Sequence, residues 1–239
     1  MAQEKTLAEL LTESAADYLV DKYFALPARV VGVHNTLKSL KVDILPLTKI
    51  VYTDGSTMEH QVIDGVQVMM LGTEDTLISF PIKIGSTVLA IFLQRDATDF
   101  RYGKGDTYSP QESRMFSELD AVVIPGLFPF SKSPNNPAVR TLTHNTEDLV
   151  LSHNIGTDGE SEVRIKKGGG IQINCPNDNV VVNAKTANVS ADSATIDVAA
   201  TTWIGDITHT GTLISNGIQY DTHIHSGVLR GPGATDGPQ

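Results

Sequence analysis

The sequence predicts an all-β chain, in which a small closed barrel is followed by an intertwined triple-stranded β-helix built by three copies of the chain. Three observations lead to this fold class. Strand-like runs fill much of residues 26–133, an alternating apolar row then recurs every seven residues, and a His-x-His pair stands near the end. The predicted layout is an N-terminal helix over residues 1–25, the barrel over 26–133, the β-helix over 138–206 and a metal-bound apex over 207–239.

A helix is predicted over residues 4–24. Thr6 stands three positions before Glu9, which is the arrangement of a capping box. In a capping box, each of the two side chains accepts a hydrogen bond from the backbone N–H of the other residue. The apolar residues that recur at helical spacing are Leu7, Leu10, Leu11, Tyr18 and Leu19.

The predicted barrel consists of short β-rich runs separated by turn residues. Five strands in about a hundred residues suit a small closed barrel. Residues 131–137, which are rich in Ser, Asn and Pro, can neither continue a helix nor form a central strand, so they mark the end of the barrel. The five runs are residues 28–34, 40–46, 65–71, 80–85 and 86–93.

Beyond the barrel, a set of three alternating apolar residues recurs every seven positions. Coiled coils share this period, but the residues in between are Asn, Ser, Thr and Asp, which are poor helix formers. Short strands with a turn between them fit better, and residues 163–165 and 171–175 already show the same alternation. The equivalent central positions of successive units are Val182, Val189, Ile196 and Trp203.

One row of small apolar side chains cannot offset the entropy lost when the backbone of a single chain becomes ordered. Three copies wound around a common axis would cover each row with two others and pair every strand edge, which predicts a homotrimer. A single-chain β-sandwich or solenoid is the alternative. We call the equivalent positions Val182, Val189, Ile196 and Trp203 the apolar column. If this column faces inward, three Trp203 indoles, one from each chain, meet near the axis. We favour at least partial burial of Trp203 over a position on the outer surface.

His223 and His225 are separated by one residue, so in a strand both imidazoles point to the same face. Two ligands do not complete a transition-metal site, which needs four to six donors. Three chains around an axis would supply six nitrogens. The alternative is that these two residues are ordinary surface or packed histidines.

The composition of the chain argues against several classes of partner and of targeting segment. The formal net charge is −10 and no local basic patch is visible, so a nucleic-acid partner is not expected. The first residues lead into a charged amphipathic helix, so no signal peptide is expected, and no apolar run reaches the ~20 residues of a membrane span. The single cysteine, Cys175, excludes an intrachain disulfide and is expected to be a packed thiol rather than a nucleophile.

Taken together, these segments resemble the central spike proteins at the tip of contractile phage tails and of related injection machines. The closing segment, residues 222–227 with residues 233–238, is the most specific part of the resemblance. Residues 80–92 and 120–127 resemble the oligonucleotide/oligosaccharide-binding (OB) barrel of that family, and residues 205–211 and 216–218 resemble its needle.

The resemblance implies a trimeric structural protein of the virion, without enzymatic activity, that pierces the host outer membrane when the tail contracts. It would be made in the host cytoplasm, stand at the tip of the tail baseplate, and bind other baseplate or tail tube proteins through its N-terminal domain. In that family the paired histidines of three chains bind an iron ion near the apex. His223 and His225 would then hold one iron per trimer with six His ligands, and octahedral coordination favours iron over zinc.

Two other functions are weaker alternatives. In a mononuclear iron enzyme, Asp221 would join the two histidines as a carboxylate ligand. In a glycan- or receptor-binding tail module the barrel would read a ligand, but aromatic residues make up only 6% of the chain and do not alternate with basic ones. The remaining histidines are expected to be structural or surface residues: His34, His60, His144, His153 and His209.

Overall fold

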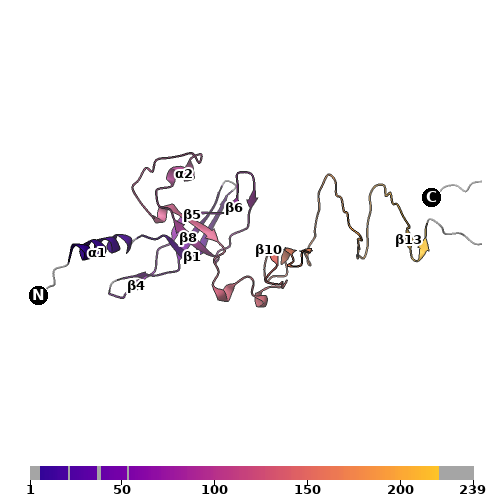
Figure 1. Ribbon diagram of the computed structural model, residues 1–239, viewed down its shortest axis with the longest axis horizontal. Helices are drawn as coiled ribbons and strands as arrows, with labels where there is room; N and C mark the ends of the chain where they lie inside the picture. Colours follow the sequence, from indigo (N-terminus) through magenta and orange to yellow (C-terminus); the bar gives the residue numbers. More distant parts are fainter. Residues whose placement is uncertain (1–5, 21, 37–38, 53, 221–239) are drawn as a thin grey trace, which may run out of the picture. The chain divides into compact units, whose positions relative to one another are not determined.

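The computed structural model describes residues 6–20, 22–36, 39–52 and 54–220 (Figure 1). The chain divides into two units, residues 1–181 and 182–239. Within the described residues, no helix is both long enough and apolar enough to cross a membrane.

The N-terminal helix, α1, spans Leu7–Val20. The backbone N–H of Thr6 donates to the Glu9 carboxylate over 2.7 Å, and the N–H of Glu9 donates to the Thr6 hydroxyl over 3.3 Å. The predicted capping box is therefore confirmed. The bond from the Thr6 N–H lowers the pKa of Glu9, so the carboxylate stays charged beside the positive end of the helix dipole.

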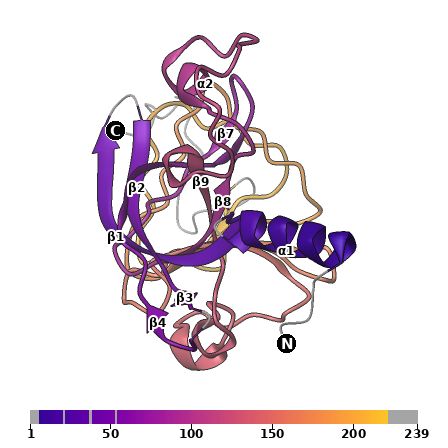
Figure 2. The ribbon, with the colours of Figure 1, turned by 90° about the vertical axis from the view of Figure 1, so that its left-hand side faces the viewer.

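The predicted closed barrel is confirmed, with five strands in the order β1-β2-β5-β9-β8. Strands β1 and β2 form a long antiparallel pair, which Figure 2 shows side by side. Every neighbouring pair in the barrel is antiparallel except β5 and β9, which are parallel. The barrel strands are β1 (Ala25–Thr36), β2 (Ser39–Pro46), β5 (Ile63–Val68), β8 (Thr87–Phe92) and β9 (Ala121–Pro125).

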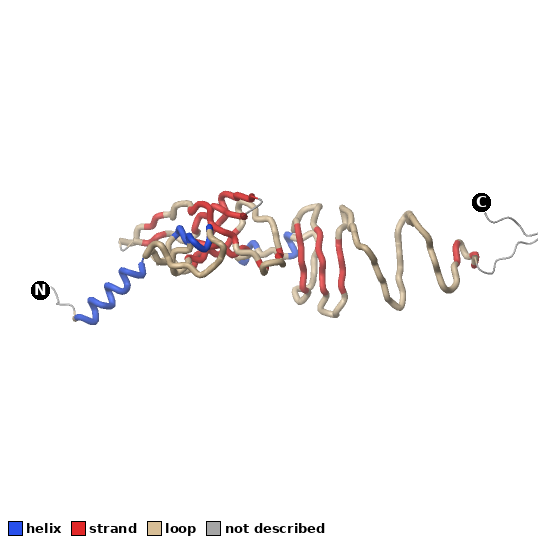
Figure 3. The backbone as a smooth tube through the Cα atoms, turned by 90° about the horizontal axis from the view of Figure 1, so that it is seen from above, coloured by secondary structure: helices blue, strands red, loops and turns tan. Residues whose placement is uncertain are grey.

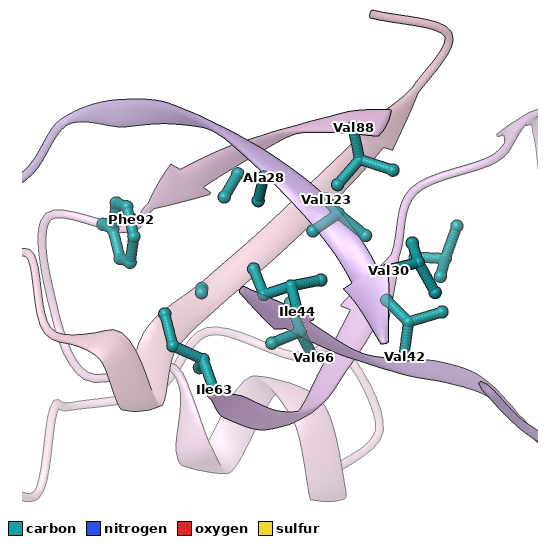
Figure 4. Close-up of a cluster of buried hydrophobic side chains, with 12 residues drawn as sticks. Ala28, Val30, Val42, Ile44, Ile63, Val66, Val88, Phe92 and Val123 are labelled. Atoms are coloured by element: carbon teal, nitrogen blue, oxygen red, sulfur yellow. The ribbon is translucent and has the colours of Figure 1, made fainter. Parts of the chain in front are cut away.

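All five strands contribute to the core of the barrel (Figure 4). Alternation is clearest in β8, where every second residue is buried: Val88, Ala90 and Phe92. Val30, Ile44 and Val123 are likewise fully buried, so the interior is filled with small, mostly β-branched side chains. Side chains therefore fill the interior, as they do in other small barrels.

One predicted barrel strand is wrong. Residues 80–85 form no strand, because Pro81 has no N–H to donate to a ladder and Gly85 turns the chain at a φ of +91°. The Gly85 N–H then donates to the Val30 carbonyl over 2.8 Å, at the start of the pairing between β8 and β1. Strand β9 takes the fifth place in the barrel instead.

A buried ion cluster holds the loop between β8 and β9 onto the barrel. The Arg114 guanidinium binds the carboxylates of Asp96 and Asp120, whose side chains are 2% and 1% exposed. Asp96 also accepts hydrogen bonds from the Thr98 hydroxyl over 2.6 Å and from the Gln111 N–H over 3.1 Å. The two bonds from Thr98, led by that of its hydroxyl, lower the pKa of Asp96 from 3.8 to about 2, together with the Glu112 N–H and the charge of Arg114. Asp120 in turn accepts a bond from the Ala97 N–H over 2.9 Å.

The loops of the barrel carry short elements, and residues 131–137 contain only short 3₁₀ turns, as expected for a segment between two β structures. The hairpins are β3 (Ile50–Val51) with β4 (Thr57–Met58), and β6 (Leu71–Gly72) with β7 (Leu77–Ile78). The short helices are α2 (Thr98–Tyr102), η1 (Glu118–Asp120), η2 (Phe130–Lys132) and η3 (Pro137–Val139).

A three-stranded antiparallel sheet follows the linker, and Figure 3 shows its strands side by side. It comprises β10 (Leu149–His153), β11 (Ser161–Ile165) and β12 (Ile171–Asn174). The alternation in residues 163–165 and 171–175 therefore does mark strands. Strand β10 carries the same alternation, through Leu149 and Leu151, although it was not among the predicted strands.

The following segment has no strand between residues 175 and 213, all of which the structure describes. Every residue from 176 to 218 is exposed in the single chain, and Figure 3 shows the backbone running back and forth in successive passes. The only pairing in this unit, within the described residues, is the hairpin of β13 (Ile214–Ser215) and β14 (Ile218–Gln219). The predicted strands of residues 180–205 thus have no ladder partners among the described residues of one chain.

Candidate functional site

The three-stranded sheet has one apolar face that the described residues of the chain leave uncovered. Strand register places its aliphatic residues directly opposite one another: Leu149 opposite Ile165, and Val163 between Leu151 and Ile173. Their exposed fractions run from 42% for Val163 to 72% for Ile171. We call this surface the apolar sheet face and define it by Leu149, Leu151, Val163, Ile165, Ile171 and Ile173.

The opposite face of the same sheet is buried and charged. The Arg140 guanidinium lies 3.1 Å from a Glu160 carboxylate oxygen and 3.0 Å from one of Glu162. Side-chain exposure is 3% for Arg140 and 0% for both glutamates. Arg140 also donates to the Ser152 hydroxyl over 2.6 Å. Arg140, which directly follows η3, therefore supplies the cation that neutralises this side of the sheet.

Further donors complete this buried cluster. Burial acts to raise the pKa of Glu160, but N–H bonds from Gly156 and Thr141, together with the nearby Arg140, outweigh it and leave the pKa below its ordinary value. Glu162 is bound by the Arg164 guanidinium and by the Asn174 amide, the latter over 2.8 Å. Because these charges are paired and hydrogen-bonded, this side of the sheet is closed within the chain, and the aliphatic side is the one that lacks a cover.

A groove of about 500 Å³ borders the apolar sheet face. Residues 79–81 form one wall, and Leu151, Val163 and Ile173 form part of the other. Cys175 also lines it, and its thiol is half-buried and free, with the sulfur 3.9 Å from the Asn179 carbonyl oxygen. No acid or base that would activate this thiol is bound to it in the described part of the chain, which fits the expected packed thiol better than a nucleophile.

The apolar column of the second unit is exposed as well. The exposed fractions are 76% for Val182, 86% for Val189, 65% for Ile196 and 66% for Trp203. Large exposed apolar patches on soluble proteins usually mark interaction sites, and these four side chains are candidates for one. The burial predicted for Trp203 concerns an assembly of three chains and stays a prediction.

The barrel allows a comparison with known proteins, because its extent and strand order are defined. Residues 26–126 match the family described as "Phage protein Gp138 N-terminal domain". The match covers all five barrel strands, and residues 127–239 lie outside it. Comparison of the chain with curated proteins gives no significant match. The resemblance to phage proteins is therefore confirmed for the Gp138-like barrel, by which we mean residues 26–126.

The metal prediction lies outside this comparison and outside the described structure. His223 and His225 fall within residues 221–239, which the structure does not describe, as does Asp221. Among the described residues, no group of three or more His, Cys, Asp or Glu side chains could hold a metal ion.

The other histidines take ordinary positions. In the Gp138-like barrel, His34 pairs with the Asp43 carboxylate over 2.7 Å, and the buried His60 ring meets the Tyr23 ring edge-on, with centroids 5.1 Å apart. His144 hydrogen-bonds the Asn145 carbonyl over 2.7 Å. His153 ends β10 and His209 lies in the second unit, and both are exposed.

Sequence reasoning missed two parts of this site. Leu149 and Leu151 belong to the apolar sheet face. A strand could have been predicted here, because leucines recur at every second position of residues 149–152. The buried cluster around Arg140 gave no such signal, because isolated charged residues in a polar segment normally predict a solvated surface.

Proposed function

We propose that the chain is the trimeric central spike at the tip of a contractile phage tail, a structural protein that pierces the host outer membrane. The Gp138-like barrel supports the phage assignment. The observation that carries the proposal is the exposure of two apolar surfaces, the apolar sheet face of the first unit and the apolar column of the second unit. A single chain has nothing to cover either surface within its described residues, whereas two further copies offer matching rows.

The proposed mechanism is mechanical. Three chains would close the open strand edges of residues 163–205 against one another, so that each backbone N–H and C=O gains a partner from a neighbouring chain. A thin rod with all its strands paired resists bending under axial load. Contraction of the tail would drive this rod through the membrane, and the protein would bind the rest of the baseplate at its N-terminal end. No step of this mechanism requires turnover.

The first prediction concerns Ile171 and Ile173, which are 72% and 59% exposed in the single chain. Replacing both with Asp should cost a monomer less than about 0.5 kcal/mol, because exposed substitutions are usually that mild. In the proposed trimer, six carboxylates would face one another across a buried axis. We expect Ile171→Asp/Ile173→Asp to convert the trimer to monomer, as measured by native mass spectrometry.

The matched control is Lys166→Asp, in the turn between β11 and β12, which is exposed but does not belong to the apolar sheet face. It should leave a trimer. A wild-type chain that is a folded monomer, or a double variant that remains trimeric, would contradict the proposed assembly.

His223 and His225 are proposed to hold one iron ion per trimer. The donor set fits iron, because six neutral imidazole nitrogens satisfy octahedral coordination and leave no position open for a substrate. The bound metal would supply a cross-link between the three chains at these residues.

The second prediction follows from this site. His223→Ala/His225→Ala should abolish iron binding, while the trimer persists because the apolar rows of residues 163–203 bury their surface independently of the metal. Elemental analysis should give one iron per three wild-type chains and none in the variant. Protease should then cut the variant after about residue 221, whereas His209→Ala should keep its metal. One metal per chain, or metal retained by the double variant, would refute the symmetric site.

A further inference from the structure

A small pocket lies on the outer surface of the Gp138-like barrel, where the loop between β8 and β9 meets strands β2 and β5. Its volume is about 230 Å³. Lys41 of β2 lies directly opposite Gln67 of β5 in the strand register, and both residues line the pocket. The neighbouring Val42 and Val66 are buried in the core, so the side chains of the lysine and the glutamine point outward.

Helix α2 supplies the other wall of the pocket, through Arg101 and Tyr102. The Arg101 guanidinium donates to the carbonyl oxygens of Leu119 and Ala121, the latter over 2.6 Å. These two bonds hold α2 against the start of β9. The Lys41 ammonium lies 5.4 Å from the centroid of the Tyr102 ring, which is 77% exposed. The barrel thus brings together side chains from three separate segments of the chain.

The pocket carries two positive charges that no carboxylate neutralises among the described residues. The carbonyls that hold Arg101 are neutral, and neither Arg101 nor Lys41 forms an ion pair with another described residue. Asp43, on the same outer face of β2, is already bound by His34 over 2.7 Å and by the Gly65 N–H over 2.9 Å. In a chain of net charge −10, two such cations at one pocket favour an anionic ligand.

One of these cations also has an unused hydrogen-bond donor. The Nε–H of Arg101 is shielded from solvent and has no hydrogen-bond partner among the described residues. Buried donors are almost always paired, so an exception calls for an acceptor that the protein itself does not provide. An anionic oxygen is the strongest acceptor for a guanidinium.

The other groups of the pocket indicate a sugar. The Gln67 amide both donates and accepts hydrogen bonds, as hydroxyl groups require, and the exposed ring of Tyr102 offers an apolar surface for the C–H side of a sugar ring. Sites for drug-sized ligands measure about 300–1,000 Å³, so this smaller pocket suits a single sugar residue. Single-stranded nucleic acid would need a basic groove with several successive aromatic side chains, whereas one aromatic residue lines this pocket.

We propose that this pocket binds one sugar residue that carries a carboxylate or a phosphate group. Lys41 and Arg101 attract the anionic group, Gln67 binds hydroxyl groups, and the sugar ring packs on Tyr102. All four residues belong to the Gp138-like barrel, so the site does not depend on the proposed spike assembly, and either proposal can fail while the other stands.

NMR titration of the full chain with glucuronate, glucose 6-phosphate and neutral glucose tests the site. At low salt, at least one acidic sugar should bind with a Kd of about 1 mM, as is typical of a small ligand with few contacts. Glucose should bind at least tenfold more weakly, and so should acetate and inorganic phosphate, which lack the sugar. The acidic sugar that binds more tightly identifies the preferred anionic group.

Variants assign the binding to this pocket. Lys41→Gln and Tyr102→Ala should each weaken binding of the acidic sugar about tenfold. The matched controls are Lys104→Gln and Tyr108→Ala, which replace an exposed lysine and an exposed tyrosine of the same loop that do not line the pocket and should bind as the wild type. Unchanged affinity in either pocket variant, equal affinity for glucose, or no binding up to about 10 mM overturns the proposal. Tighter binding of a single-stranded oligothymidine than of either acidic sugar also overturns it.

Discussion

Replacing Arg140 with Met should unfold the three-stranded sheet while leaving the Gp138-like barrel folded. The substitution keeps the side-chain volume but leaves Glu160, which is fully buried, without the cation that lies 3.1 Å away. Removing one partner of a buried ion pair typically costs about 3–5 kcal/mol, because the remaining charge is stranded away from water. We expect amide hydrogen exchange in β10, β11 and β12 to become at least a hundredfold faster.

Two controls separate this effect from loss of an arginine in general. Arg29→Met removes an exposed arginine of β1 and should change exchange little. Adding Glu160→Gln to Arg140→Met removes the stranded charge and should recover part of the protection. Unchanged exchange in the sheet of the single variant would mean that the cluster contributes nothing to its stability.

Replacing Arg114 with Met should destabilise the barrel by a similar amount, about 3–5 kcal/mol, because two carboxylates with almost no exposure lose their shared cation. The cluster also makes the barrel sensitive to acid. Folding lowers the pKa of Asp96 from 3.8 to about 2, so the folded barrel binds fewer protons than the unfolded chain in this range. The stabilisation is therefore present above about pH 4 and is lost as the pH falls toward 2.

Pepsin cleavage within residues 25–125, followed between pH 4 and pH 2, measures both effects. The wild type should become steadily more susceptible as the pH falls, and Asp96→Asn should flatten that dependence. Arg114→Met should be cleaved even at pH 4, whereas Arg95→Met, at an exposed position, should behave as the wild type. Equal resistance of Arg114→Met and the wild type at pH 4 would rule out a stabilising role for the cluster.

The features that could be predicted from the sequence are those that depend on a pattern of nearby residues. The capping box of Thr6 and Glu9 requires only two side chains three residues apart, and the inward residues of β8 follow from alternation alone. The barrel was predicted with the right number of strands, but residues 80–85 were chosen where β9 belongs. Pro81 was the local evidence against that choice, since proline cannot donate to a central ladder.

The features that could not be predicted from the sequence depend on contacts between residues that are far apart along the chain. Arg140 meets Glu160 and Glu162 only because the linker folds back over β11, and nothing in the local pattern around any of the three predicts burial. The same holds for Arg114 with Asp96, which are brought together by the long loop before β9. Local composition predicts that such charged residues are exposed to solvent. Their burial becomes favourable only because the tertiary fold brings oppositely charged side chains together in ion pairs.

Strand β9 determines the order in which the barrel can be completed. It pairs with β5 on one side and with β8 on the other, so both of those strands keep an open edge until β9 has been synthesised. A growing chain emerges from its N-terminus, and the barrel therefore remains an open, curled sheet until about residue 125 has been added. The aliphatic segments that follow are made only after that closure. Closure of the barrel at that point would remove its open strand edges before the apolar rows of residues 163–203 have been made.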